Sequence, residues 1–534
     1  MLIEPTDLIG TTNQIMLMRL TEQYRLARIS KYVRGHQDPP YVPRGASTEY
    51  RWIMRKSLRN FLPLVVSVIS QNLHVDGYRP EGQTNITANA VLAPQRTTNP
   101  MWDAFRANRM VSRQHGVHRS VIKFGSAYAV VLPGQLSTDE EQQGTDVPVM
   151  RPVSPRRMTA LYASDVDDEW PQVAVEVKTV NMPGNKVRSY VSVYDEQFRY
   201  ILSGSPGVAA TGGGSQSVTQ LNLQLALPDD PILAGQAPVS EHGLGVCPVV
   251  RFLYEADLDG ESDCSGEVEP IMPVQDQINF DTFNLMMSEQ YSAFRQRWIA
   301  GMAPVDSEGR DAAPFRPGVD RVWAAEDPGT HFGEFSETAL APYSTVREDG
   351  IRHMATITQV PPYHLLGQVA NLSAEALAAA RDGLDRKIQE LQALLTDPWR
   401  NVFRLTALAS GDKENWNDLF GTVVWRDTSA RAFGSTIDGL TKVAQMLGVP
   451  EEELWSRVPG VTAEDVQAWQ LAAQREQAQQ IVQQAVSAGQ IAGVPNPATG
   501  VPALPGQTPQ PFANPAALPP APAGPGGAPQ EPGA

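Results

Sequence analysis

The spacing of apolar side chains predicts helices in the first quarter of the chain. Residues Thr11–Tyr32 carry apolar side chains close to a helical period, at Ile15, Met18, Leu20, Tyr24, Leu26 and Ile29. A second helix is expected from Thr48 to Leu73, with a kink or boundary at Pro63, because proline lacks the N–H that a helix interior needs. A third helix is expected over residues 101–124, and Gly125 should end it.

The pattern then changes to that of β structure. Ala127–Leu132, Val173–Val180, Tyr190–Leu202 and Cys247–Tyr254 are rich in β-branched and aromatic residues and interleave polar with apolar positions. Residues 203–217 are rich in glycine and serine, which favours a flexible loop. Separate runs of helices and strands indicate an α+β fold.

The region from Glu267 to Val360 has the most informative pattern. Pro270 and Pro273 fit the first turn of a helix, and the helical pattern then continues to Ile299, which gives a helix about 45 Å long. Its apolar residues form two stripes, one of Phe280, Phe283, Met287, Tyr291, Phe294 and Trp298, the other of Ile271, Val274, Ile278 and Leu285. Two apolar faces predict packing against more than one neighbour.

A polar, Gly/Pro-rich excursion over residues 301–335 follows, and a second helix is expected over Thr338–Thr358. Gly367–Leu372 should be a short loop. Ser373 can cap a third long helix, which Pro398 should kink.

The last part of the chain begins with a predicted strand, Thr422–Asp427, that returns to the β region. Residues 429–488 are again helical in pattern. After Val494 the chain has thirteen prolines and one charged residue, Glu531, so this tail cannot form a core and is expected to be disordered or extended.

Composition narrows the function classes. Apolar residues make up 42% of the 534 residues, as in a folded protein of two to four domains, and no uncharged apolar run reaches the length of a membrane span. The acidic first residues do not resemble a signal peptide. The only cysteines, Cys247 and Cys264, are expected to be plain thiols in a reducing compartment, and a disulfide between them is the less favoured reading.

The formal net charge of −16 argues against a protein that grips DNA, because phosphate binding requires clustered Lys and Arg. Basic residues nevertheless gather in two places. Residues 1–60 hold ten Lys and Arg against five Asp and Glu, and a second basic stretch runs from Arg106 to Lys123. A solvated basic face is the favoured interpretation, and a nucleic-acid contact is the alternative.

Reactive chemistry has few candidates. Asp165–Glu169 has carboxylates that could hold Mg²⁺ or Ca²⁺, although an acidic surface turn is the favoured reading. His115 and His118 share a predicted helix face without a third ligand nearby. The chain lacks a phosphate-binding P-loop and a Gly-x-Ser-x-Gly nucleophile motif. No catalytic residue, cofactor or metal site is therefore predicted, and the chain is not expected to be an enzyme.

Several short motifs together carry a resemblance to a known family. They are Lys31-Tyr-Val-Arg-Gly-His36, Trp102, Gly125-Ser-Ala-Tyr-Ala-Val130, Gly266-Glu-Val-Glu-Pro-Ile271, Gln275-Asp-Gln-Ile-Asn279, Arg297-Trp-Ile-Ala-Gly301, Arg321-Val-Trp323, Phe332-Gly-Glu-Phe335, Gln359-Val-Pro-Pro-Tyr363 and Asn371-Leu-Ser-Ala-Glu-Ala-Leu377. With these motifs the chain resembles the portal proteins of tailed bacteriophages, particularly phages of actinobacteria, over roughly residues 20–480.

The resemblance implies a portal fold with named parts and a ring oligomer. The parts would be a mixed wing (1–266), a first stem helix (267–300), a clip (301–337), a second stem helix (338–360), a tunnel loop (361–372), a long kinked helix with a return to the wing (373–428), a helical crown (429–488) and the tail (489–534).

The resemblance also implies roles for particular residues. Stem packing would involve Phe283, Met287, Tyr291, Phe294 and Trp298. The DNA-facing tunnel loop would be Gly367, Gln368, Val369, Ala370 and Asn371. Partner docking by the clip would involve Phe315, Arg321 and Trp323.

The partners that the family implies are further copies of the chain in a ring, usually of twelve, and double-stranded DNA passing through it without sequence specificity. They also include the terminase large subunit, capsid or scaffold proteins and head-completion proteins. The protein would lie at the portal vertex of the virion, and in the host cytoplasm during assembly. Two alternatives stay open from the residues alone: a metal-dependent enzyme using Asp165–Glu169, and a monomeric head–tail adaptor or scaffold.

Overall fold

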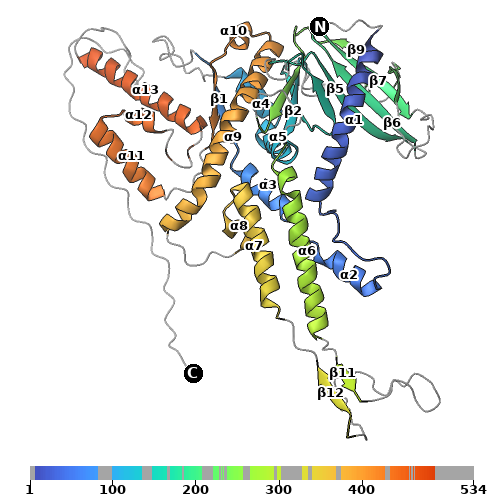
Figure 1. Ribbon diagram of the computed structural model, residues 1–534. Helices are drawn as coiled ribbons and strands as arrows, with labels where there is room; N and C mark the ends of the chain where they lie inside the picture. Colours follow the sequence, from blue (N-terminus) through green and yellow to red (C-terminus); the bar gives the residue numbers. More distant parts are fainter. Residues whose placement is uncertain are drawn as a thin grey trace, which may run out of the picture. The chain divides into compact units, whose positions relative to one another are not determined.

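The computed structural model describes the larger part of the chain and confirms an α+β fold (Figure 1). The residues described are 7–81, 99–134, 147–164, 169–182, 186–206, 221–227, 230, 233, 237–255, 265–293, 297–301, 328–334, 339–367, 374–426, 433–455, 458, 461 and 463–487. In these residues no helix is long and apolar enough to cross a membrane.

The N-terminal helices confirm the predicted pattern, with two boundaries that the sequence left imprecise. The helices are α1 (Leu8–Val33), α2 (Thr48–Ser57), α3 (Leu62–Gln71), α4 (Pro100–Ala107) and α5 (Met110–Phe124). Pro63 lies in the first turn of α3 and so marks a boundary, not a kink. The helix predicted over residues 101–124 is two helices, because Arg109 adopts a left-handed conformation with φ 57° between them. Gly125 ends α5 with φ 88°, as expected.

Two antiparallel sheets form most of the β structure. The larger has the order β4-β5-β6-β7-β8, with β9 paired to β7, and the smaller has the order β10-β2-β3. The strands are β2 (Ser126–Leu132), β3 (Val149–Val153), β4 (Met158–Leu161), β5 (Val173–Met182), β6 (Lys186–Tyr194), β7 (Phe198–Pro206), β8 (Leu221–Leu225), β9 (Val239–Glu241) and β10 (Val249–Leu253). Of the loop predicted over residues 203–217, the first four residues continue β7 and the rest lies outside the described residues.

The single strand predicted over Tyr190–Leu202 is wrong, because two strands occupy this segment. β6 ends at Tyr194 and β7 begins at Phe198, and the two pair as a hairpin. Asp195 makes the turn: its carboxylate Oδ1 accepts hydrogen bonds from the backbone N–H groups of Gln197 (2.8 Å) and Phe198 (2.6 Å). A short acidic side chain that bonds the backbone two residues on is typical of such turns.

Side chains join the two sheets to each other and to α1. Leu8 and Ile15 of α1 are buried against the larger sheet. Between the sheets, the buried carboxylate of Glu176 on β5 pairs with Arg151 of β3 (2.6 Å) and with Arg157 (2.7 Å). Both carboxylate oxygens are thus matched by guanidinium groups, so this buried charge is compensated.

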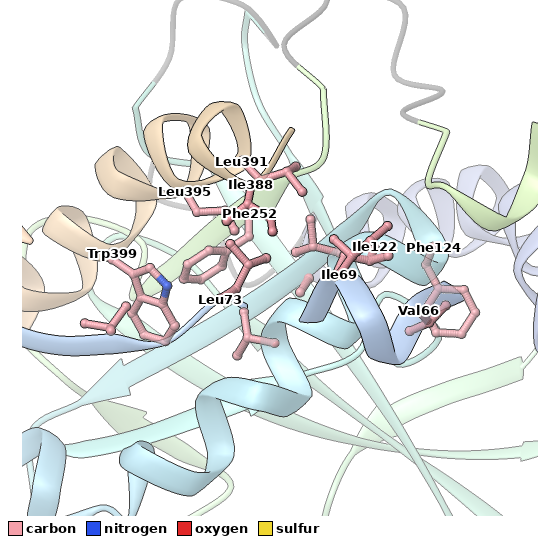
Figure 2. Close-up of a cluster of buried hydrophobic side chains, with 14 of the residues drawn as sticks. Val66, Ile69, Leu73, Ile122, Phe124, Phe252, Ile388, Leu391, Leu395 and Trp399 are labelled. Atoms are coloured by element: carbon pink, nitrogen blue, oxygen red, sulfur yellow. The ribbon is translucent and has the colours of Figure 1, made fainter. Parts of the chain in front are cut away.

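The main core lies where α3, α5 and β10 meet the long helix α9 (Ala374–Ala409), as Figure 2 shows. Trp399 of α9 is fully buried and meets the edges of Phe105 and Phe252. Pro398, predicted to kink this helix, lies inside it. Strand β1 (Val75–Arg79) pairs with β13 (Thr422–Trp425) as a separate two-stranded ribbon, so β13 does not join either larger sheet.

The other elements of the first contact unit, residues 1–468, follow in chain order. They are α6 (Val268–Ala293), β11 (Arg297–Ala300), β12 (His331–Glu334), α7 (Ala341–Thr358), α8 (Pro362–Leu366), α10 (Lys413–Trp416), α11 (Phe433–Leu447) and α12 (Glu451–Leu454). The second unit begins at Trp469, within α13 (Ala463–Ser487). The helical prediction for residues 429–488 is therefore confirmed where the chain is described, and the proline-rich tail lies outside it.

Candidate assembly surface on the α6–α7 helix pair

Helices α6 and α7 run side by side, joined by the segment that holds the β11–β12 hairpin (Figure 1). They approach closely at Gly350 of α7, where a Cβ added to the glycine would lie 3.1 Å from the Ile278 side chain. Ile278 and Met354 are fully buried. The facing sides of the two helices are thus buried against each other within one chain.

A buried amide network fixes the segment between α1 and α3 against α6. Asn279 accepts from the Arg59 backbone N–H (2.9 Å) and donates to Gln37 Oε1 (2.6 Å). One turn earlier, Gln275 donates to the Arg59 carbonyl (3.1 Å) and accepts from the Phe61 N–H (3.0 Å). Gln275 and Asn279 are both fully buried. Because buried amides are costly unless they are hydrogen-bonded, these contacts specify how this segment meets the helix.

A second polar contact at the same level of α6 is electrostatically unusual. The Tyr32 hydroxyl lies 2.9 Å from Oδ2 of Asp38 and 2.9 Å from Oδ2 of Asp276. One hydroxyl proton can serve only one of these carboxylates, and the other oxygen of Asp276 is buried without a partner. Burial raises the pKa of Asp276, whereas the bonds from Tyr32 and Lys31 lower the pKa of Asp38.

Helix α2 covers another face of α6. Ser47 caps α2 by accepting from the Tyr50 N–H at 3.2 Å, and the rings of Tyr50 and Phe283 pack in a T-shaped arrangement with their centres 5.1 Å apart. Phe283, predicted to pack between stem helices, is only 2% exposed within the single chain. Met287 is half-buried on the same helix. Tyr291 lies in the last turn of α6.

Of the other predictions for the first stem helix, two are wrong and one falls outside the described residues. The helix predicted to reach Ile299 ends at Ala293, and Trp298 lies on β11, opposite Gly333 of β12. Aromatic and β-branched residues favour a strand here, and apolar spacing alone could not separate the two structures. Phe294 lies outside the described residues. Pro273 is inside α6, beyond the first turn predicted for it.

Apolar side chains on both helices remain exposed. Phe280 on α6 is 42% exposed, and Val346 and Ile357 on α7 are 52% and 51% exposed. Val346 and Ile357 are eleven residues, or about three turns, apart, so they lie on one side of α7. These three exposed apolar side chains make up the candidate assembly surface of the helix pair.

An ion-pair network joins the start of α6 to the end of α7. Lys387 of α9 pairs with Glu267 at 2.6 Å and donates to the Thr358 carbonyl at 3.1 Å. The Tyr254 hydroxyl also donates to Glu267. Gln359 follows with φ 56°, a left-handed conformation that is uncommon outside glycine. The start of α6 and the end of α7 are thereby tied to one lysine of α9.

The segment predicted as a tunnel loop is partly helical. Pro362–Leu366 forms the short helix α8, and Leu365 is buried. Gly367 then adopts φ 69° and is exposed. The other predicted loop residues lie outside the described residues: Gln368, Val369, Ala370 and Asn371. The same holds for the predicted clip residues Phe315, Arg321 and Trp323.

The histidine candidates for a metal site are occupied by other contacts. His118 is fully buried, donates from Nδ1 to the Leu73 carbonyl (3.1 Å) and accepts at Nε2 from the Trp399 N–H (3.1 Å). A carbonyl can only accept and an indole can only donate, so the neutral tautomer is fixed. Burial lowers the pKa of His118 to about 3. His115 packs against the ring of His74, 5.3 Å away.

The carboxylate candidate is only partly visible. Glu169 forms an ion pair with Arg404, and residues 165–168 lie outside the described residues. Within the described part of the chain, no group of three or more His, Cys, Asp or Glu residues could hold a metal ion. Cys247 is a buried free thiol, as expected, and Cys264 lies outside the described residues.

Comparison with known proteins gives the family. The profile described as phage portal protein, SPP1 Gp6-like, matches residues 24–480. The chain belongs to this phage portal protein family. The portal proteins of Mycobacterium phages D29 and L5 are each 28% identical over 211 residues, which are 38% of this chain and 43% of theirs. The chain thus spans less than half the length of these relatives.

Among solved structures, one chain described as "Neck of native GTA particle computed with C12 symmetry" aligns with 11% identity and a TM-score of 0.40. The alignment covers 79% of this portal-family chain and 94% of that one. The family assignment confirms the resemblance that the sequence motifs indicated.

Proposed function

We propose that this chain is a structural subunit of a phage portal ring, with twelve the expected subunit number. Such a ring would form the channel for DNA packaging and ejection at one capsid vertex. The observation that carries the proposal is the pair of uncovered apolar surfaces, Phe280 on α6 and Val346 with Ile357 on α7. Two different surfaces on one subunit suit a head-to-tail contact, in which one surface of each copy meets the other surface of the next copy. Such contacts close into a ring when the rotation between neighbouring copies divides a full turn.

The proposed parts of the ring are assigned in the order of the elements along the chain. Helices α6 and α7 would be the stem, and the segment between them, with the β11–β12 hairpin, the clip that docks the terminase and later the head-completion proteins. The segment from Pro361 to Leu372 would face the DNA, and α11 to α13 would form the crown. The α-helices and sheets of residues 1–266 would form the wing and meet capsid or scaffold proteins.

The proposed role requires geometry more than reactive side chains. His118 bonds Leu73 and Trp399, and Glu169 pairs with Arg404, so both side chains have partners within the chain. An acidic wall repels phosphate, so a chain of net charge −16 suits DNA that must slide.

The symmetry of the purified full-length protein tests this proposal. Mass photometry and negative-stain imaging should give closed rings with a central pore at assembly concentrations. Phe280→Asp combined with Val346→Asp would place charge in the contact and should leave monomers, since an unpaired buried charge is costly. A matched control is Leu419→Asp combined with Phe420→Asp, two exposed apolar residues between α10 and β13. Wild-type particles that are only monomers or compact dimers would contradict the ring.

A further inference from the structure

Helix α5 has one apolar face and one cationic face. At 100° per residue, its four basic positions fall within about a third of the helix circumference. They are Arg109, at the helix N-cap, and Arg113, Arg119 and Lys123. The positions between them on this face are small: Ser112, Gly116 and Ser120. The face therefore presents positive charge over about 20 Å with room for close approach along it.

The charge of this face is not neutralised by acidic groups among the described residues. The sequence of α5 contains no Asp or Glu. Arg109, Arg113 and Arg119 are exposed, and none of the three forms an ion pair in the part of the chain that the structure describes. Surface arginines left uncompensated in a chain of net charge −16 form a local exception to the overall charge.

More cations gather at the C-terminal end of the same helix. Lys123 is half-buried, with its ammonium 4.2 Å from the centre of the Phe124 ring. Burial, together with the positive charges of Arg34 and Arg156, lowers the pKa of Lys123 to about 8. Arg156 donates to the Ser30 hydroxyl at 3.3 Å, but its Nε is buried without a partner. Like charges held together with an unused donor favour an anionic ligand.

The opposite side of α5 holds this cationic face rigidly. Gln114 accepts from the Val75 N–H at 2.7 Å and donates to the Val75 carbonyl at 3.1 Å. His118 is fixed by its bonds to Leu73 and Trp399. Binding of a ligand to the charged face therefore costs little conformational entropy of the protein.

We propose that the basic face of α5, extended by Arg34 and Arg156, binds the phosphate backbone of double-stranded DNA. Several cations in a row match the repeated phosphates of a DNA strand. An acidic side chain of another protein could pair with only one or two of these cations. Serine and glycine between the arginines carry no base-reading group, so binding is independent of sequence. The inference rests on the proposed function, in which DNA is the partner, and it adds a DNA contact on α5 to the one proposed for the segment from Pro361 to Leu372.

Salt-dependent binding of a mixed-sequence 30-base-pair duplex to the full-length protein tests this assignment. The double variant Arg113→Gln with Arg119→Gln should make the negative slope of log K against log salt shallower by about 1.8, because each phosphate contact contributes about 0.9. At about 0.1 M salt the affinity should fall between about 10- and 100-fold. Lysine at both positions should restore the slope, which separates charge from folding.

The matched control removes the same charge from another exposed basic helix, by Arg51→Gln with Arg55→Gln on α2. This variant should keep the wild-type slope. An equal fall in both variants, or no fall in either, would overturn the assignment to α5. Loss of rings in the α5 variant with an unchanged slope would instead identify this face as a contact between subunits. Wild-type protein without rings would refute the proposed function while leaving the slope comparison intact.

Discussion

Gly266 lies where the start of α6 crosses the end of α5, and the space there excludes even one methyl group. A Cβ at this position would lie 2.6 Å from the Gly125 nitrogen, 2.7 Å from the Ile122 oxygen and 2.9 Å from the Lys123 carbonyl carbon. All three atoms belong to the backbone, so no side-chain rotation relieves the contact. Gly266→Ala must therefore move one helix relative to the other.

The size of the effect follows from these contacts. An ordinary Cβ contact begins at 3.4 Å, so the backbone must shift by several tenths of an ångström in more than one direction. Overpacking of this kind costs about 1–3 kcal/mol. The shift also strains the hydrogen bond from the Glu267 N–H to the Ile122 carbonyl (2.8 Å), worth about 1 kcal/mol. The expected loss is about 2–4 kcal/mol of the free energy of unfolding.

Thermal unfolding followed by circular dichroism measures this loss. Gly266→Ala should lower the Tm by roughly 2–8 °C. Gly116→Ala on α5 is the matched control, since no atom lies within 4 Å of the Cβ that alanine would add there, and alanine favours a helix by about 1 kcal/mol over glycine. Its Tm should stay the same or rise. A Gly266→Ala protein that melts within about 1 °C of wild type would refute the reasoning.

Three further predictions concern α6 and the segment after α7. Burial raises the pKa of the Asp276 carboxyl, so its charged form destabilises the fold above that pKa. Asp276→Asn should therefore raise the Tm at neutral pH, and the gain should vanish as the pH falls below the ordinary aspartate pKa of about 4. A gain equal at all pH values would contradict the shared-proton geometry. Asn279→Leu leaves Gln37 Oε1 and the Arg59 N–H without partners and should cost about 2–4 kcal/mol in thermal unfolding, against little change for exposed Gln389→Leu on α9. Deleting Gly367–Asn371 should leave rings intact in electron micrographs but reduce packaged DNA, measured as nuclease-protected genomes, and unaltered filling would remove this loop from the mechanism.

Local patterns predicted most helices and several strands, because burial of one face fixes the period of apolar residues. They failed where a contact distant in sequence or a single backbone angle decides the structure. Arg109 splits α4 from α5 although nothing in its residue type requires a left-handed conformation. Trp298 continues the helical spacing, yet it pairs with a strand more than thirty residues later.

On the candidate surface, too, local patterns predicted the helix faces but not the contacts between distant segments. Apolar spacing identified the two faces of α6, but it could not assign Phe283 to α2 and leave Phe280 exposed, because that choice depends on where α2 packs. The amide network was also missed. Its signal was a Gln and an Asn four residues apart, Gln275 and Asn279, within an otherwise buried stripe.

The ribbon of β1 and β13 has a consequence for synthesis. Arg79 lies opposite Thr422, 343 positions later in the chain. At ribosomal rates of about 5–20 residues per second, β1 leaves the ribosome about 20–70 s before its partner. During that interval its edge is unpaired, and Trp399 cannot yet occupy the core beside His118. A nascent or truncated chain that ends before β13 thus keeps an unpaired strand edge and an incomplete core. Such a chain is a substrate for chaperones and proteases and cannot assemble.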